Sequence, residues 1–501
     1  MVGLLKGLKP WKQFAAVFFA LFFSYSGASA QQTEYFPFYS RDTLASFKLA
    51  SAHRASFKTA LPAPTAVSSD YKNQYKKIVN HGADHVYNAI RYGSLADTLL
   101  APYIRKVYDR IVKANKNLPP TSIFLTRNPS ENAYATLDGT LFFNVGLLAK
   151  LENESQLAFI ISHELSHAYF KHTQNGLHKE LASIYNKDFQ KEYKKIVREE
   201  YNKNSKLEAL VRNVSLNNLY HDRKDEKQAD SLAYVLLSNS GYDATQAYTA
   251  LQLLDKIDEP YTKENFDLQK FFTCPAFQYS FTGKPAKKQS IFNIQADTSI
   301  FQKSDTLKTH PDCAKRMRYI SDLAKMKPAP APKFQEDEAR FSQIRAVSRR
   351  EVLQSLFDLE YYDYSLFNSL VFLKDDPESS YFKAMVGLSL YKLKENLEDH
   401  TYSDVVSKIS NNQPENFSQF LGVLHNLKVT DFKGFAGCFN EAFQIKPETN
   451  EYNLAARYTF LALKDTVLEA EELKQQYFKT YKGGRFEKKL FAENTAPKKK
   501  K

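Results

Sequence analysis

The HExxH sequence at residues 163–167 constrains the fold of this chain more than any other feature. Histidines four positions apart, here His163 and His167, lie one turn apart on the same face of an α-helix, so both imidazoles can reach one zinc ion. Glu164 points to the adjacent edge of that helix, where it can take a proton from a metal-bound water. Apolar residues precede the motif, and Asn153 stands at a capping position, so we predict a buried helix that carries a zinc site.

A third ligand would make this site convincing. Glu226 lies in a helical stretch that runs on to Leu237, and it can complete a His, His, Glu set with water in the fourth position. Asp230 follows one turn later on the same face, where its carboxylate can accept the N–H of a ligand imidazole. His172 lies about 140° around the helix from His167. We therefore expect a structural role for His172.

Composition excludes several classes of protein. With 43% hydrophobic residues, 25% charged residues and three cysteines among 501 residues, the chain is not collagen-like, disordered or disulfide-dense. The net charge of +13 does not indicate nucleic acid, because seven of the excess lysines lie in the first 12 residues and in the terminal run Lys498–Lys501. We expect no nucleic-acid partner, and we interpret residues 486–501 as a basic tail.

Residues 1–30 have the pattern of a secretory signal peptide. A basic leader precedes the apolar run Phe14–Tyr25, which is too short to span a bilayer comfortably, and Gly27–Ala30 supplies a cleavage site. An uncleaved anchor is the alternative. No later stretch of the sequence is apolar enough to span a membrane, so we expect an exported, periplasmic chain that starts near Gln31 and is at most peripheral to the outer membrane.

The three cysteines allow at most one disulfide bridge. Cys274 and Cys313 lie in one region of the sequence, and Cys438 lies far from both. A bridge between Cys274 and Cys313 and a buried Cys313 thiol are both compatible with the spacing.

Proline-rich stretches at residues 61–65 and 327–332 divide the chain. Beyond Lys333 the pattern is helical almost throughout, and three Pro-Glu steps recur at spacings of 37 and 33 residues. This spacing resembles degenerate tetratricopeptide repeats, with a plain helical bundle as the alternative. The expected parts are a signal peptide (1–30), an N-terminal linker (31–70), a mixed domain that holds the metal site (71–325), a proline-rich linker (326–333), helical repeats (334–485) and the basic tail (486–501).

The run Thr140-Leu141-Phe142-Phe143-Asn144 is rich in β-forming residues and lies between two glycines. We predict that it forms an edge strand beside the zinc helix. An edge strand offers unpaired N–H and C=O groups, so an extended substrate peptide can add to it largely regardless of sequence. Residues 259–308 have weak periodicity, and we interpret them as a lid across the cleft.

Two flanking segments resemble those of a known family. Asn132–Ala135 and residues 139–148 are similar to the stretch that precedes the zinc helix in gluzincin metallopeptidases. Thr309–Pro311, followed by Arg316, is similar to their "[ST]HP…R" segment. With the HExxH and ExxxD motifs, residues 71–325 resemble the gluzincin family that contains the CAAX prenyl endopeptidase, HtpX and BepA, and the helical tail resembles the BepA arrangement.

This resemblance implies an α+β, mainly α fold, in which a zincin-like domain with a small sheet precedes an all-α repeat domain. It implies one zinc ion per chain, with Glu164 as the catalytic residue. His310 and Arg316 would lie near the site, as oxyanion-stabilising or regulatory residues, and a structural role for each is the alternative.

We therefore predict an exported zinc metalloendopeptidase that hydrolyses unfolded or misassembled envelope proteins. Its partners would be polypeptide substrates and, through the repeats, outer-membrane assembly components. The alternative is a latent peptidase that acts mainly as a chaperone-like binding scaffold. Deleting residues 334–501 should separate the two, since a peptidase would still cut a flexible peptide.

Overall fold

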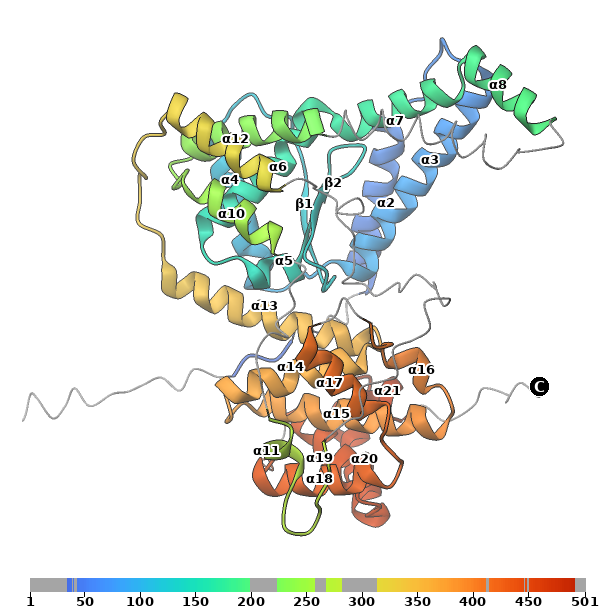
Figure 1. The fold of residues 1–501 in the computed structure, drawn as a ribbon, viewed down its shortest axis with the longest axis vertical. Coiled ribbons are helices and arrows are strands. Elements are labelled where there is room, and N and C mark those ends of the chain that lie inside the picture. Colours follow the sequence, from blue (N-terminus) through green and yellow to red (C-terminus); the bar gives the residue numbers. More distant parts are fainter. Residues whose placement is uncertain are drawn as a thin grey trace, which may run out of the picture. The chain divides into compact units, whose positions relative to one another are not determined.

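The computed structural model describes residues 34–37, 39, 43–198, 223–256, 267–281, 313–410, 414–445, 447 and 450–491. Over these residues the fold is mainly helical with one small three-stranded sheet (Figure 1), which confirms the predicted fold class. The expected signal peptide, His310 and most of the expected basic tail lie outside the described residues. Within the described part, no helix is long and apolar enough to cross a membrane. Phe36–Lys501 cluster as one compact unit, and the fold below is that of this unit.

The sheet has its strands in the order β1-β3-β2, with β1 at Ile123–Thr126, β2 at Ala133–Ala135 and β3 at Leu141–Asn144. β3 pairs in parallel with β1 and antiparallel with β2, and all four of its residues are buried. The prediction that Thr140–Asn144 form an edge strand is therefore wrong. A strand that is paired on both sides and covered on both faces has a continuous apolar run, as this one does, instead of an alternating pattern.

Two glycines fix the ends of β3. Gly139, at φ +85°, allows the tight turn that joins β2 to β3. Gly146 follows β3, and a Cβ atom there would lie 2.1 Å from the carbonyl oxygen of Pro129. Its backbone N–H also donates a hydrogen bond to the carbonyl of Asn128 at 3.2 Å. The loop before β2 is therefore held directly against the residues that follow β3.

Two long helices, α2 (Thr43–Ala60) and α3 (Ser69–Asn88), pack together and share a core with the sheet and α7 (His172–Ile184). The prediction that residues 31–70 are a linker is wrong for α2, which buries Ala50 and Phe57. These buried residues lie seven positions apart, whereas the larger apolar residues Leu44, Phe47 and Leu49 of the same helix are exposed. The apolar residues of α2 therefore do not mark its buried face in the sequence. The π-helical turn η1 (Ala89–Gly93) ends α3.

The remaining helices of the N-terminal half surround α6 (Glu154–Phe170), which carries the HExxH sequence. α6 contacts β2, α4, α7 and α10, and α10 contacts α12. Residues 223–239 are helical and carry Glu226 and Asp230. The bounds of the others are Leu100–Ala114 for α4, Val145–Lys150 for α5, Lys187–Val197 for α8, Gln246–Asp255 for α10 and Cys313–Met326 for α12.

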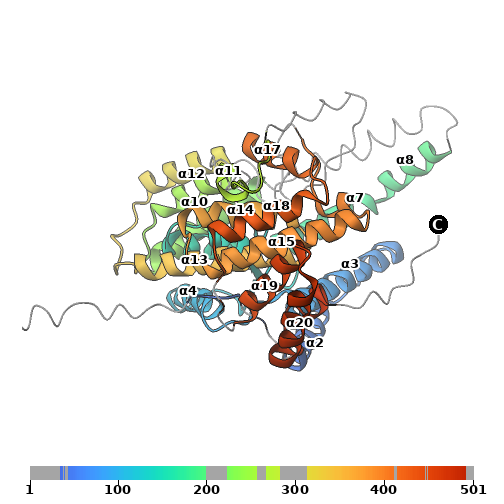
Figure 2. The ribbon, with the colours of Figure 1, turned by 90° about the horizontal axis from the view of Figure 1, so that it is seen from below.

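The C-terminal helices share one large aromatic core. α13, α14 and α15 lie side by side (Figures 1 and 2), and α19 packs between α15 and α20. α15 begins at Ser380, three residues after Pro377, and α17 begins at Glu415, immediately after Pro414, so both helices start near the prolines that predict helix starts. The bounds are Glu338–Asp358 for α13, Tyr362–Asp375 for α14, Ser380–Glu398 for α15, Tyr402–Val405 for α16, Glu415–Leu424 for α17, Asp431–Ala442 for α18, Glu451–Leu463 for α19, Val467–Tyr481 for α20 and Glu487–Leu490 for α21.

The segment after the proline-rich stretch packs against the N-terminal half. The backbone N–H of Lys333 donates to the carbonyl of Gly241 at 2.9 Å, and the ring of Phe334 lies 5.1 Å from that of Tyr242. The guanidinium of Arg110 stacks 3.9 Å over the Phe334 ring. α13 then packs against α5 and α4. Lys333 and Phe334 therefore attach the start of the C-terminal half to the domain that contains α6.

A second connection is covalent. Cys274 and Cys438 form a disulfide bridge, and Cys313 is a buried free cysteine, so the considered bridge between Cys274 and Cys313 is wrong. Residues 267–281 include the short helix α11 (Gln269–Phe272), which packs on α18 of the C-terminal half. This is the described part of the expected lid, and in that part the lid interpretation is wrong. Residues 267–281 are placed by packing in the aromatic core of the C-terminal helices, which lie far along the sequence. The spacing of residues within the segment does not reveal this.

Candidate metal centre

α6 is buried on nearly all sides, so its face with the two histidines is fixed from several directions. Residues Glu154–Ser166 are all buried, as is typical of a helix that crosses the middle of a core. The side chain of Asn153 caps the helix by accepting the N–H of Gln156 at 2.8 Å, as predicted. The helix ends at Lys171, whose φ of 55° is left-handed.

The first turn of α6 has a second acceptor that comes from far along the chain. One carboxylate oxygen of Glu336 accepts the backbone N–H groups of Glu154 at 2.9 Å and Ser155 at 3.2 Å, and the Ser155 hydroxyl donates to the other oxygen. A carboxylate here also interacts favourably with the positive end of the helix dipole. The side chain of Glu154 in turn accepts hydrogen bonds from the hydroxyls of Tyr103 and Tyr242. These contacts hold the helix that presents the HExxH residues.

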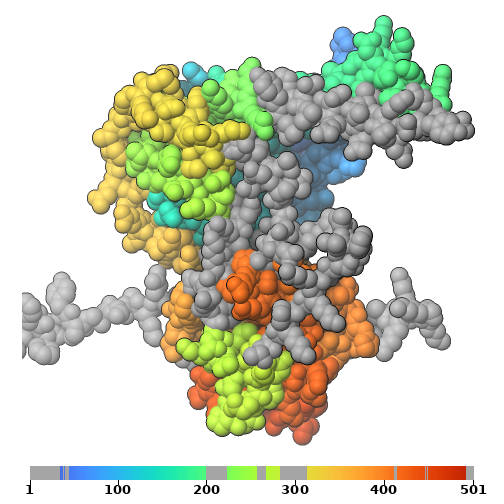
Figure 3. Space-filling model, in the orientation of Figure 1, coloured from blue at the N-terminus to red at the C-terminus, as the bar shows by residue number. Residues whose placement is uncertain are grey.

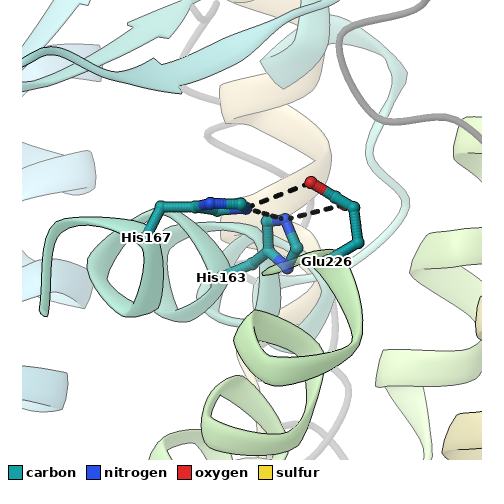
Figure 4. Close-up of side chains that lie close together, drawn as sticks. All are labelled: His163, His167 and Glu226. Atoms are coloured by element: carbon teal, nitrogen blue, oxygen red, sulfur yellow. Dashed lines mark hydrogen bonds and ion pairs between the residues drawn. The ribbon is translucent and has the colours of Figure 1, made fainter. Parts of the chain in front are cut away.

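The side chains of His163, His167 and Glu226 converge (Figure 4). The Nε2 atoms of the two histidines lie 3.0 Å apart, and the Glu226 carboxylate lies 3.3 Å from His167 Nε2 and 3.5 Å from His163 Nε2. Ligand atoms about 2.0–2.1 Å from a tetrahedral zinc ion are themselves roughly 3.3 Å apart. The donor set and its spacing therefore fit a tetrahedral site with one position left open.

Asp230 lies behind His163. Its Oδ1 atom is 3.0 Å from Nδ1 of His163, the ring nitrogen directed away from His167 and Glu226. Burial opposes ionisation of this carboxyl, but the charge of Arg316 and the hydrogen bonds from Arg316 and His163 outweigh it and lower the pKa of Asp230 to about 2. Asp230 is thus an anion that can fix the tautomer and ring orientation of His163.

Arg316 joins the two acidic side chains of this site. Its Nε and Nη2 atoms donate to the two oxygens of Asp230 at 2.8 and 2.7 Å, and Nη1 lies 2.9 Å from Oε2 of Glu226. Burial disfavours the charged guanidinium, but the two carboxylates reverse this and raise the pKa of Arg316. Of the roles expected for Arg316, these contacts support holding the acidic residues in place.

His172 contacts His167 from outside the cluster formed by His163, His167 and Glu226. Its Nδ1 atom lies 3.0 Å from Nδ1 of His167, and its Nε2 atom lies 3.2 Å from Oε1 of Gln228. The expected angle of about 140° assumed a continuous helix, whereas the left-handed Lys171 ends α6 and turns His172 back toward it. Sequence reasoning missed this contact and Gln228, and no glycine marks the break.

Glu164 is buried on α6 between the two histidines and lies close enough to His167 to interact electrostatically. Burial lowers the pKa of His167, which favours the neutral imidazole that a metal requires. Burial and Arg316 act the same way on His163, but the hydrogen bonds that it donates to Asp230 and Glu226 outweigh them and raise its pKa.

β2 is the strand of the sheet that contacts α6. Asn132, Tyr134 and Thr136 pair with β3 through their backbone groups, so the backbone groups of Ala133 and Ala135 point to the opposite side. The carbonyl of Ala135 accepts the Thr173 hydroxyl at 3.3 Å. The edge expected at Thr140–Asn144 is thus provided by β2.

Replacing Arg316 with methionine should weaken the site, since it leaves the Asp230 and Glu226 carboxylates buried without their cation. We expect a loss of about 3–5 kcal/mol in the free energy of unfolding and a metal affinity about 10- to 100-fold lower. Arg318→Met is the matched control, because Arg318 is exposed on the same helix. Chelator competition and thermal unfolding measure both effects, and equal behaviour of the two variants would contradict the role given to Arg316.

An HExxH helix with a glutamate from a later helix defines the gluzincin class of metallopeptidases. Residues 98–324 match the model of peptidase family M48, so the chain carries a peptidase M48 domain. Two curated relatives are beta-barrel assembly-enhancing proteases, from Escherichia coli (strain K12) at 35% identity and from Yersinia pestis at 33%. Each match spans 82 residues, 16% of this chain and 17% of the relative.

Proposed function

We propose that this protein is a zinc metalloendopeptidase. The convergence of His163, His167 and Glu226 at the spacing of a tetrahedral site, on a helix that also carries Glu164, is the observation that supports it. Zinc held by these three side chains would polarise the scissile carbonyl and acidify the attacking water. Glu164 would accept the proton of that water and later pass it to the leaving amine.

The surrounding residues hold this arrangement in place. Asp230 orients His163 through the hydrogen bond at 3.0 Å, and Arg316 holds Asp230 and Glu226 together. Both acidic side chains and the arginine are buried, so each of them has few alternative conformations. Such preorganised contacts keep the ligands in one geometry while substrate binds and leaves.

We infer that the substrate is an extended polypeptide that pairs with β2. The backbone of Ala135 points away from β3, on the strand that contacts the metal helix, and this residue is partly exposed, so its N–H can pair with a peptide laid along this edge. Backbone pairing depends little on side chains. It therefore suits unfolded or misassembled proteins, which expose extended segments.

The proposed location is the bacterial periplasm, peripheral to the outer membrane. The Cys274–Cys438 disulfide supports an oxidising compartment, and the pattern of residues 1–30 supports export. The similar proteins from E. coli and Y. pestis are described as enhancing β-barrel assembly. By analogy, we propose misassembled envelope proteins as clients and outer-membrane assembly components as partners of the tetratricopeptide-like C-terminal helices.

The metal content of Glu226→Gln tests the ligand assignment. The chain from Gln31 onward should contain one zinc ion per molecule and cleave casein, whereas the variant should lose both metal and cleavage, because an amide replaces the only carboxylate of the ligand cluster. Glu180→Gln, on the exposed face of α7, is the control and should keep both. Full zinc occupancy in Glu226→Gln would show that Glu226 is not a ligand.

A further inference from the structure

Residues 267–281 lie within the stretch that matches the peptidase family, yet they pack on the C-terminal helices. Figure 3 shows this segment, in yellow-green, on the surface of the orange and red C-terminal helices. Phe271 and Phe272 of α11 are buried in the C-terminal core, and the ring of Phe272 stacks on that of Phe435 at 4.7 Å. α11 is thus a firm anchor for the residues that follow it.

In residues 277–281, which follow α11, burial alternates from one residue to the next. Phe277, Tyr279 and Phe281 are half-buried, while the residues between them are exposed. Alternation of this kind is typical of an extended chain that lies with one face on a surface. All three rings contact the Phe435 ring on α18, with centroids at 6.0, 5.1 and 5.9 Å.

The surface beneath these rings is shaped to admit them. A Cβ atom at Gly434, the neighbour of Phe435, would lie 2.3 Å from the ring of Phe277. A glycine at this position therefore lets an aromatic ring approach the backbone of α18 directly. We call the surface formed by Gly434 and Phe435 the α18 platform.

A disulfide controls how far the segment can leave this platform. Cys274 lies between the anchor and the alternating rings, and its partner Cys438 lies on α18 itself, one turn beyond Gly434. The Cys438 side chain is 2% exposed, whereas Cys274 is only half-buried. A thiol in solution can therefore reach the bond from the Cys274 side.

We propose that the α18 platform is a binding site for extended polypeptides with aromatic side chains at alternate positions, and that residues 277–281 occupy it as an internal ligand while the Cys274–Cys438 disulfide is intact. The inference goes beyond the proposed hydrolysis, since it assigns a separate binding surface. Its occupant has the chemistry of an amphipathic strand, in which every second side chain is apolar.

Opening requires a dithiol reductant. A thiolate of the reductant attacks Cys274 Sγ, the bond between the two protein sulfurs breaks, and Cys438 leaves as a thiolate that takes up a proton. The second thiol of the reductant then displaces Cys274, which also becomes a thiol, and the reductant is left as a disulfide. Residues 277–281 are then held only by the α11 anchor and by three half-buried rings.

Binding of a synthetic peptide tests the proposal. The probe is residues 273–281 with serine in place of Cys274 and a fluorescent label, and the protein is the chain from Gln31 onward with Glu164→Gln, so that the outcome does not depend on hydrolysis. Fluorescence anisotropy should show binding at least about tenfold tighter after reduction with dithiothreitol, because the internal ligand is no longer held at a high effective concentration. A probe with alanine at all three aromatic positions should not bind.

A pair of variants makes the test independent of reduction. Phe277→Ala/Tyr279→Ala/Phe281→Ala should bind the probe even in the oxidised protein, since the platform is uncovered there. Gln278→Ala/Ser280→Ala changes the exposed positions of the same segment and should behave like the parent. Equal binding before and after reduction, equal binding by the two variants, or loss of helical circular dichroism on reduction would each overturn the proposal, the last by showing that the disulfide only maintains the fold.

Discussion

Glu164→Gln should lose peptide hydrolysis by a factor of about 10³ or more while keeping its zinc. Proton transfer by a positioned carboxylate contributes about 10²–10⁴ in rate, and glutamine has nearly the same shape but no basic oxygen. Glu164 is buried on the same helix as His163 and His167, and it is not one of the three side chains that converge. The variant should therefore fold and bind metal as the parent does.

Paired assays make this result interpretable. Zinc content and cleavage of casein are measured for the parent, for Glu164→Gln and for Glu180→Gln, which removes an exposed carboxylate from α7. Cleavage lost only in Glu164→Gln, with one zinc per chain in all three, supports the assigned base. Near-normal cleavage by Glu164→Gln would refute the mechanism, and absence of zinc from the parent would refute the metal site.

A chain that ends at Lys333 should be largely unfolded or insoluble, with little bound zinc. It lacks Phe334, which packs on Tyr242 and Arg110, and Glu336, which accepts two N–H groups of α6. It also lacks α13, which covers α5, and the core that buries α11. The expectation that a chain without residues 334–501 would still cut a flexible peptide does not allow for these contacts.

A shorter truncation and single substitutions show which of these contacts stabilise the fold and the zinc site. Removing residues 492–501 alone is the matched truncation and should have little effect on zinc content. Glu336→Ala should lower the free energy of unfolding by about 1–3 kcal/mol, because buried donors lose their acceptor, while Glu338→Ala, at an exposed position two residues on, should change it little. A soluble chain ending at Lys333 with zinc and normal cleavage would show that the two halves are independent.

Much of the local geometry of the site could be predicted from the sequence. Helical spacing alone places His163 and His167 on one face, and a second helix with Glu226 one turn before Asp230 is brought beside them in the structure. The reason is that a metal site limits the donor types and their spacing far more narrowly than packing limits apolar residues. The mainly helical fold class follows from periodicities that a helix imposes on each segment separately.

Contacts between segments far apart in the sequence could not be predicted from these local patterns. The central position of β3 depends on two partners, and the choice of Cys438 over Cys313 depends on where α11 finds its core. The contact of His172 with His167 depends on one left-handed residue, Lys171, at a position that any side chain can fill with modest strain. In each case the deciding interaction is long-range or conformational, and no pattern within a short window encodes it.

The hydrogen bonds that α6 donates to Glu336 join a helix that is synthesised early to an acceptor that is synthesised much later. The two residues are 182 positions apart in the sequence, so the helix that bears His163, Glu164 and His167 leaves the ribosome roughly ten seconds or more before its acceptor is made. A nascent chain thus contains every proposed catalytic group before it contains the residue that completes their helix. The helix that carries these groups therefore lacks two of its N-terminal hydrogen bonds until about two thirds of the chain has been synthesised.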